Sequence, residues 1–331
     1  MRPRKWRHYL ALGVTAFGVV AVSIVLFFAL EHFSAIRELL DTVGYILRPI
    51  FYGMVLTFLL LPVQRRILAF LTQCLTGVGK EGGQYLSQEG VYLYDRTGKG
   101  LDPSVFTAGG VNFTLGEGPQ ILILHSHGSE AYSQNDGDRY QEGDPFRTTD
   151  CGHNVVRVGE EMAQVFRAHG FQVVHDTNLY DYPAYNGAYD RSQAAVRDWL
   201  SQYPTIRIIL DVHRDALVGE DGAIYKLVSQ ENGEKTAQVM LVVGTDAGGA
   251  DHPGWADNLA LAIRLQRELA ADYVSLARPV VLRSSSYNQQ LSPGSLLVEV
   301  GGHGNTLTEA LRGARLFAES ASQVFSGMRA G

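Results

Sequence analysis

The chain has 331 residues, of which 46% are hydrophobic and 19% are charged, and its formal net charge at pH 7 is -6. This composition excludes an intrinsically disordered chain, and the length allows one globular domain with a smaller accompanying part. The negative charge excludes a nucleic-acid-binding function, because a polyanionic partner requires a basic surface.

The N-terminus begins with a cationic head, and residues 9–30 then carry no formal charge. About 20 apolar residues are enough to cross the hydrocarbon core of a bilayer as a helix. A cleavable signal peptide has a shorter apolar region of about 7–15 residues, followed by small residues. We therefore expect residues 1–30 to form a cytoplasmic head and an uncleaved transmembrane anchor, with the following chain outside the cytoplasm.

Residues 31–79 contain a second apolar stretch, from Val43 to Val63. An arginine-proline pair near its start and two arginines after it leave three interpretations open: a second span, a re-entrant segment or a helix lying on the membrane. A second span would return the rest of the chain to the cytoplasm. We expect a single anchor followed by a membrane-associated region over residues 31–79, and the number of spans stays open.

After Lys80 the composition changes to glycine, serine and charged residues, which is typical of a linker with one hairpin at most. We expect this linker over residues 80–118 and a folded domain over residues 119–331. In the domain, apolar runs of strand length alternate with amphipathic segments of helix length, which predicts an α/β fold. Its three layers would be a mostly parallel sheet with helices on both faces. The strands are expected at 121–125, 171–176, 206–213, 238–245 and 295–301, and the helices at about 154–168, 190–202, 254–272 and 307–328.

Chemically useful side chains follow these strands. His125 and His127 lie two apart at the end of the first strand, which allows both imidazoles to point to one side, and Glu130 comes three residues later. His213 ends the run IRIILDVH, and its acidic neighbours either orient a ligating imidazole or form a structural ion pair. Because open α/β sheets place their sites at the strand ends, we expect these side chains to converge on one metal ion.

Glu299 lies in the run SLLVEVGG, where its strand neighbours are apolar. Burying an unpaired carboxylate is costly, so this side chain requires a cation, a network of donors or a raised pKa. One interpretation is a salt bridge to Arg283 or Arg214. The other makes Glu299 the general base of a metal hydrolase, close to the ion but not bound to it.

Several of these runs resemble a known family. ILILHSHGSEAY, DVHRDA and SYNQQLSPGSLLVEVGG, with the spacing between them, are similar to the stage II sporulation protein P family of endospore-forming bacteria, over about Gly118 to Phe325. The resemblance implies a membrane-anchored, zinc-dependent peptidoglycan hydrolase related in fold to the N-acetylmuramoyl-L-alanine amidases. It also implies cleavage of the bond between muramic acid and L-alanine, and of peptide cross-links, during septal thinning and engulfment.

The same resemblance implies partners and a location. The partners are peptidoglycan, the lytic transglycosylase stage II sporulation protein D and the membrane protein stage II sporulation protein M. The location is the cell membrane, with the catalytic domain in the intermembrane space of the sporulation septum.

The resemblance to the amidases assigns the zinc ligands. His127, Glu130 and His213 match them, and His125 is the alternative first ligand. The amidases usually take their carboxylate ligand from the start of the following helix, so two further alternatives stay open, Glu160 and Glu161.

Glu299 matches the catalytic glutamate of the amidases. Arg214 is assigned a catalytic role toward a substrate carboxylate or the developing oxyanion, and Arg283 and Asn288 are further candidates on charge and placement. Two other functions stay open: a catalytically inactive peptidoglycan-binding module, and a zinc peptidase or deacetylase acting on small substrates.

Overall fold

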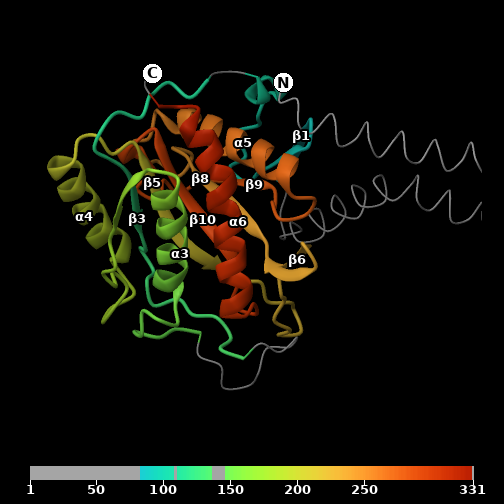
Figure 1. The fold of residues 1–331 in the computed structure, drawn as a ribbon. Helices are drawn as coiled ribbons and strands as arrows, with labels where there is room; N and C mark the ends of the chain where they lie inside the picture. Colours follow the sequence, from blue (N-terminus) through green and yellow to red (C-terminus); the bar gives the residue numbers. More distant parts are fainter. Residues whose placement is uncertain (1–82, 108–109, 136–145, 330–331) are drawn as a thin grey trace, which may run out of the picture. The chain divides into compact units, whose positions relative to one another are not determined.

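The computed structural model describes residues 83–107, 110–135 and 146–329, which form an α/β unit (Figure 1). The predicted anchor over residues 1–30 and the membrane-associated region over residues 31–79 lie outside the described residues. Within the described part of the chain, no helix combines the length and apolar character needed to cross a membrane.

A mixed sheet of eight strands forms the centre of the unit, in the order β1-β2-β9-β8-β10-β5-β3-β4. Two neighbouring pairs, β1–β2 and β8–β10, are antiparallel, and the other five are parallel. The strands are β1 (Gln84–Gln88), β2 (Val91–Asp95), β3 (Pro119–Leu124), β4 (Gln172–His175), β5 (Ile208–Asp215), β8 (Val239–Gly244), β9 (Val280–Arg283) and β10 (Gly294–Gly302). The expected α/β fold with a mostly parallel sheet is therefore present.

Three helices cover one face of the sheet. They are α3 (Val155–Ala168), α5 (Trp255–Asp272) and α6 (Leu307–Ser326). Alternate residues of the central strands face them, among them Leu210 and Val212 of β5 and Val298 of β10, and all join one apolar core. Figure 1 shows α3 and α6 side by side in front of the sheet.

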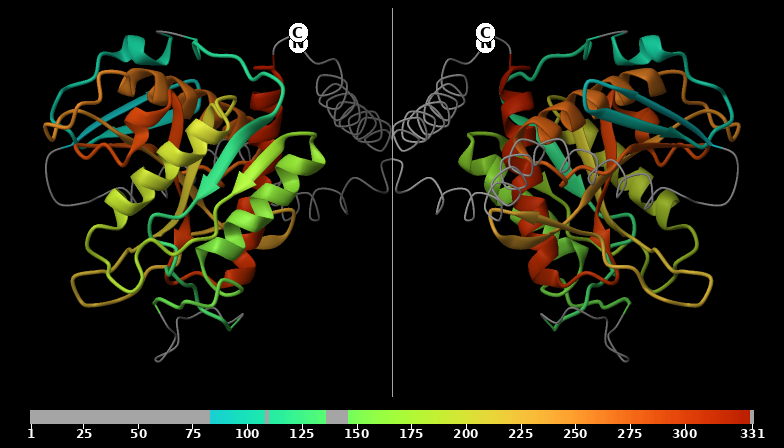
Figure 2. Two further views of the ribbon diagram at one scale, coloured as in Figure 1. Left: turned by 90° about the vertical axis from the view of Figure 1, so that its left-hand side faces the viewer. Right: turned by 90° about the vertical axis from the view of Figure 1, so that its right-hand side faces the viewer.

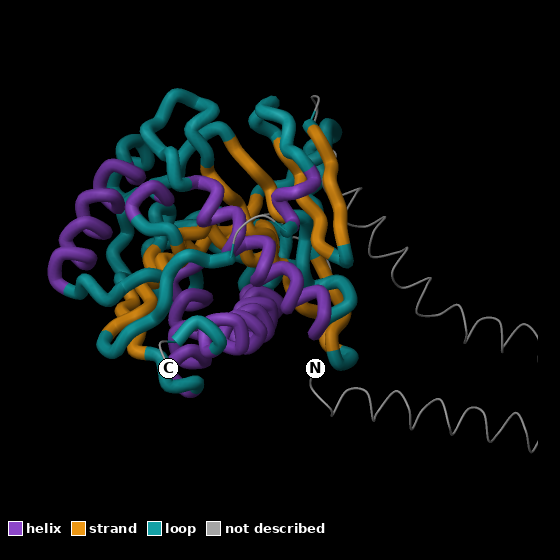
Figure 3. Tube along the Cα trace, turned by 90° about the horizontal axis from the view of Figure 1, so that it is seen from above, coloured by secondary structure: helices purple, strands orange, loops and turns teal. Residues whose placement is uncertain are grey.

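The opposite face carries α4 (Ala188–Gln202), as the views in Figures 2 and 3 show. The other set of alternate strand residues packs here, including Leu122 and Leu124 of β3 and Ile209 of β5, against Val196 of α4. This face is the one that continues into the polar site, because Asp211, His213 and Glu299 follow the same alternation in their strands.

Local sequence signals explain where two of these helices begin. The Asn154 side chain accepts a hydrogen bond from the Val156 amide at the start of α3. Thr306 and Glu309 form a capping box at the start of α6, in which each side chain satisfies a backbone amide of the other residue. Both helices start within a residue or two of the positions expected from the sequence.

The hairpin that the sequence allowed within the expected linker, residues 80–118, is present and belongs to the main sheet. Part of this segment forms the β1–β2 hairpin, and β2 pairs with β9 through Leu93 and Val280, so the hairpin extends the main sheet. Val91 and Leu93 are fully buried in the core. Three further strands in the described part of the chain were not expected: β9, and the separate hairpin of β6 (Val228–Glu231) and β7 (Glu234–Ala237).

The pairing of β3, β5 and β10 fixes the position of the site. The three strands are parallel neighbours, so their carboxyl ends lie at one edge of the sheet. In register, Leu124 lies opposite Asp211, and Glu299 lies opposite His213. Residues far apart in sequence therefore meet at this edge, on the face that α4 covers.

Candidate metal centre

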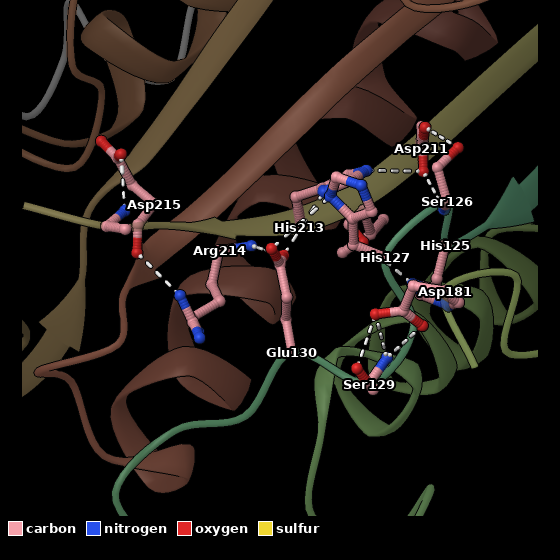
Figure 4. Close-up of polar contacts among 12 residues, drawn as sticks. His125, Ser126, His127, Ser129, Glu130, Asp181, Asp211, His213, Arg214 and Asp215 are labelled. Atoms are coloured by element: carbon pink, nitrogen blue, oxygen red, sulfur yellow. Dashed lines mark hydrogen bonds and ion pairs between the residues drawn. The ribbon is translucent and has the colours of Figure 1, made fainter. Parts of the chain in front are cut away.

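His127, Glu130 and His213 form a compact cluster at this edge. His127 and Glu130 come from the turn after β3, and His213 comes from β5. His127 Nδ1 lies 3.6 Å from Glu130 Oε1, and His213 Nδ1 lies 3.4 Å from Glu130 Oε2. The centroids of the two imidazole rings are 5.1 Å apart. Figure 4 shows the three side chains directed toward one another.

These three side chains fit a zinc ion. One donor atom from each lies within 4.8 Å of the others. Zinc–nitrogen and zinc–oxygen bonds of about 2.0–2.2 Å place neighbouring tetrahedral ligands roughly 3.4 Å apart. The 3.6 Å and 3.4 Å that separate Glu130 from His127 and His213 are close to this value. Two imidazoles with one carboxylate leave a fourth position open, which is the ligand set of a catalytic zinc rather than a structural one.

Glu130 is buried and held from two sides. The Arg214 amide donates to Glu130 Oε2 over 3.3 Å, and an Arg147 guanidinium nitrogen lies 3.4 Å from Oε1. Burial acts to raise the pKa of Glu130, but the His213 imidazole, Arg214 and His127 outweigh it and hold the pKa below its usual value. Glu130 is therefore an anion, the form that binds a metal.

His213 lies between two carboxylates. Its Nδ1 faces Glu130, and its Nε2 lies 3.0 Å from Asp211 Oδ1. Burial acts to lower the pKa of His213, but Asp211 and Glu130 outweigh it and raise the pKa well above its ordinary value. Asp211 is itself fixed by the backbone amide of Ser126 at 2.8 Å and the Ser126 hydroxyl at 2.7 Å (Figure 4). The arrangement is that of a carboxylate orienting a metal-binding imidazole.

Glu299 lies beside His213 on the neighbouring strand. Its Oε2 is buried and has no hydrogen-bond partner among the residues that the structure describes, although the residue as a whole is partly exposed. Burial raises the pKa of Glu299 to about 8, and the charges of Asp215 and Glu130 act in the same direction. The salt bridges considered from the sequence, to Arg283 or Arg214, do not form within the described residues. A carboxylate in this state suits proton transfer near neutral pH.

His125 lies outside the cluster. The alternation along β3 places it on the three-helix face, where it is fully buried against Gly159 of α3. Its Nδ1 lies 3.0 Å from Val212 O, and its Nε2 lies 3.0 Å from His175 Nε2. The expectation that the two imidazoles share one side differs from the structure, because the chain leaves the strand after Leu124 and the turn redirects His127.

The alternative carboxylate ligands also lie elsewhere. Glu160 Oε2 is 3.0 Å from His175 Nδ1, on the α3 side of the sheet. Glu161 pairs with Arg157 and Arg315. Neither belongs to the group of donors around His213.

The Arg214 guanidinium forms hydrogen bonds to backbone carbonyl oxygens, which the sequence did not indicate. It donates to the carbonyl oxygens of Ala131 at 2.7 Å and Phe146 at 2.6 Å, and it is buried. These hydrogen bonds connect β5, through Arg214, to the segment that contains Glu130. The structure therefore gives Arg214 a positioning role, in place of the expected contact with substrate. Asn288 is similarly engaged, because its amide donates to Tyr189 O at 2.8 Å.

Sequence reasoning missed several residues around the cluster. Arg147 forms an ion pair with Asp181 and lies over the Tyr185 ring, which stacks on His127 with centroids 4.6 Å apart. Tyr189 of α4 contacts the rings of both histidines. These residues lie in loops or at a helix start without a motif, so the sequence carried no signal for them. Asp211 was not missed, because it is one of the acidic neighbours of His213 considered from the sequence, and its carboxylate faces the imidazole.

The fold and the cluster define an α/β protein with a candidate metal centre at the carboxyl edge of its sheet. The chain belongs to the stage II sporulation protein P (SpoIIP) family, whose family model matches residues 94–322. Stage II sporulation protein P of Bacillus subtilis (strain 168) is 28% identical over 226 residues, which are 65% of this chain and 52% of the relative. The chain thus spans about half the length of this curated relative.

Two solved structures are also similar. The CwlD amidase from Clostridioides difficile, in complex with the GerS lipoprotein, is 14% identical, with 63% of this chain and 99% of that chain covered and a TM-score of 0.41. The N-acetylmuramyl-L-alanine amidase Ami1 from Mycobacterium smegmatis is 15% identical, with 65% and 98% covered and a TM-score of 0.37.

Proposed function

We propose that this chain is a membrane-anchored, zinc-dependent peptidoglycan hydrolase that acts in sporulation. The proposed reaction is hydrolysis of the N-acetylmuramoyl-L-alanine amide bond, the activity that family membership implies, with cleavage of peptide cross-links as a second activity. The observation that carries the proposal is the convergence of His127, Glu130 and His213 within 4.8 Å, with Glu299 paired in register with His213.

The residues suggest how the reaction would proceed. His127, Glu130 and His213 would hold the zinc, which when bound supplies a Lewis acid for the scissile carbonyl and for water activation. Glu299 takes a proton from the attacking water and delivers it to the leaving amine nitrogen of L-alanine. The carbon–nitrogen bond breaks, and a lactyl carboxylate and a free amine are formed. Arg214 and Arg147 keep Glu130 in place during this sequence.

A sacculus assay tests the proposal. The full-length protein in detergent, supplied with zinc, should release stem peptides from purified sacculi, and a chelator should stop the release until zinc is restored. Glu299→Gln should bind zinc as the native protein does and release nothing. A peptidoglycan-binding module would bind sacculi without release, and a small-substrate peptidase or deacetylase would leave sacculi intact while cleaving free peptides or acetylated sugars.

The membrane anchor, the septal location and the partners are part of the proposal. Stage II sporulation proteins D and M are the partners that family membership implies. Cys151 offers a test of location, because it is a free thiol of intermediate exposure in the described domain. In a Cys74→Ala background, a membrane-impermeant thiol reagent should label Cys151 in intact cells. Labelling only after lysis would place the domain in the cytoplasm.

A further inference from the structure

The Tyr189 ring contacts both histidines of the candidate metal centre. It lies in the first turn of α4, on the face of the sheet that carries His213 and Glu299. Its ring meets the His127 ring edge-on with centroids 5.2 Å apart, and it lies nearly parallel to the His213 ring, at 6.4 Å and an angle of 9°. One aromatic ring therefore packs against both candidate imidazole ligands.

The hydroxyl of Tyr189 is available to a ligand. Within the described residues it makes no hydrogen bond, whereas Tyr132 donates to Val300 O at 2.9 Å and Tyr180 donates to Asp176 Oδ2 at 2.6 Å. Tyr185 also stacks on His127, but its side chain is exposed to solvent. A tyrosine hydroxyl carries its proton at neutral pH and acts as a donor there.

Three other donors near the site are already engaged, and Arg283 lies on β9, which β8 separates from the strand of Glu299. The Arg214 guanidinium donates to backbone carbonyls, the Asn288 amide donates to Tyr189 O, and Arg147 is paired with Asp181. A tetrahedral intermediate of amide hydrolysis places negative charge on the former carbonyl oxygen, and a preorganised donor at that oxygen lowers the barrier. Tyr189 brings an unengaged donor to the candidate metal centre, on a ring that packs against both imidazoles.

We propose that Tyr189 is a catalytic residue whose hydroxyl donates a hydrogen bond to the scissile carbonyl oxygen as that oxygen becomes negative. The role rests on the proposed hydrolase function. The hydroxyl keeps its own proton throughout. Proton movement from the attacking water to the leaving nitrogen remains with Glu299. The two residues thus act on different atoms of the same bond.

Tyr189→Phe tests the role because it removes the hydroxyl and keeps the ring against both imidazoles. On purified muropeptides, the variant should lose about 10²–10³-fold in kcat with KM changed by less than about threefold, as for loss of one oxyanion donor. Its zinc content should equal that of the native protein. Tyr182→Phe is the matched control, because it removes a hydroxyl from an exposed tyrosine of the preceding loop and should leave both constants unchanged.

A binding measurement gives a readout that does not depend on turnover. A phosphinate analogue of the muramoyl-alanine linkage carries the charge of the tetrahedral state, and its affinity for the zinc-loaded protein should fall about 10-fold or more in Tyr189→Phe. Affinity for the uncleaved muropeptide should stay unchanged when measured in the Glu299→Gln background. Native kcat and native phosphinate affinity in Tyr189→Phe would overturn the role of Tyr189 alone. A zinc-loaded native protein that neither cleaves nor binds would overturn the hydrolase function and this role together.

Discussion

Glu299 and His213 lie opposite each other on two parallel strands, and their charges are coupled. The register of β10 against β5 pairs the two residues, and both side chains lie on the face that α4 covers. His213 is one of the groups that act on the pKa of Glu299, and it lowers that pKa, yet burial still raises it to about 8. A candidate ligand and a candidate base are thus set side by side by strand pairing.

Glu299→Gln should stabilise the metal-free protein in a pH-dependent way. The folded protein holds a proton on Glu299 up to about pH 8, whereas the unfolded chain releases it near its ordinary value of 4.5. Native stability therefore falls as pH rises between 4.5 and 8, by up to about 1.4 kcal/mol per pH unit from this group. Chemical denaturation at pH 5, 6.5 and 8 should show an advantage of the variant that grows with pH. A constant difference would contradict the raised pKa.

Zinc binding should release protons. His213 has a raised pKa in the metal-free protein and must lose its proton to bind zinc through Nδ1, and a nearby cation also favours the ionised form of Glu299. We expect roughly one to two protons released per zinc near pH 7 and an affinity that falls as the pH is lowered. Calorimetry in buffers of different ionisation enthalpy measures this number. Binding heats that are the same in every buffer would show that no proton leaves.

Asp211→Asn should weaken zinc binding without removing a ligand. The substitution replaces the carboxylate that faces His213 Nε2, and loss of such a partner typically costs about 10–100-fold in metal affinity or activity. Competition with a zinc-binding dye measures the affinity. Asp150→Asn is a suitable control, because Asp150 pairs with His153 on an exposed turn. Equal affinities in the two variants would argue against an orienting role of Asp211.

His127→Ala and His125→Ala should have opposite effects. We expect His127→Ala to lower zinc affinity by about 100-fold or more while stability changes little, because His127 is a ligand with a partly exposed side chain. His125→Ala should keep zinc but lose at least about 1–3 kcal/mol of stability, because Val212 O and His175 Nε2 lose a buried partner. Zinc content and denaturation midpoints distinguish the two. Loss of zinc in His125→Ala alone would reverse the assignment.

The sequence predicted the α/β class and most central elements because hydrophobic period and segment length are local properties. It missed β9 and the pairing of the β1–β2 hairpin with it, since β9 is only four residues long and strand partners far apart in sequence leave no local pattern. It also placed the candidate residues at strand ends, which parallel pairing brings to one edge.

Only the tertiary structure decided between the alternatives at that edge. Their spacing does not distinguish His125 from His127. In the structure, His125 lies on the face of β3 that packs against α3, whereas the turn after β3 places His127 beside Glu130. Arg214 has the charge for substrate binding, yet backbone carbonyls from a distant segment engage its guanidinium. Side-chain direction and competing partners depend on the packing of remote segments, which is why the sequence left these roles open.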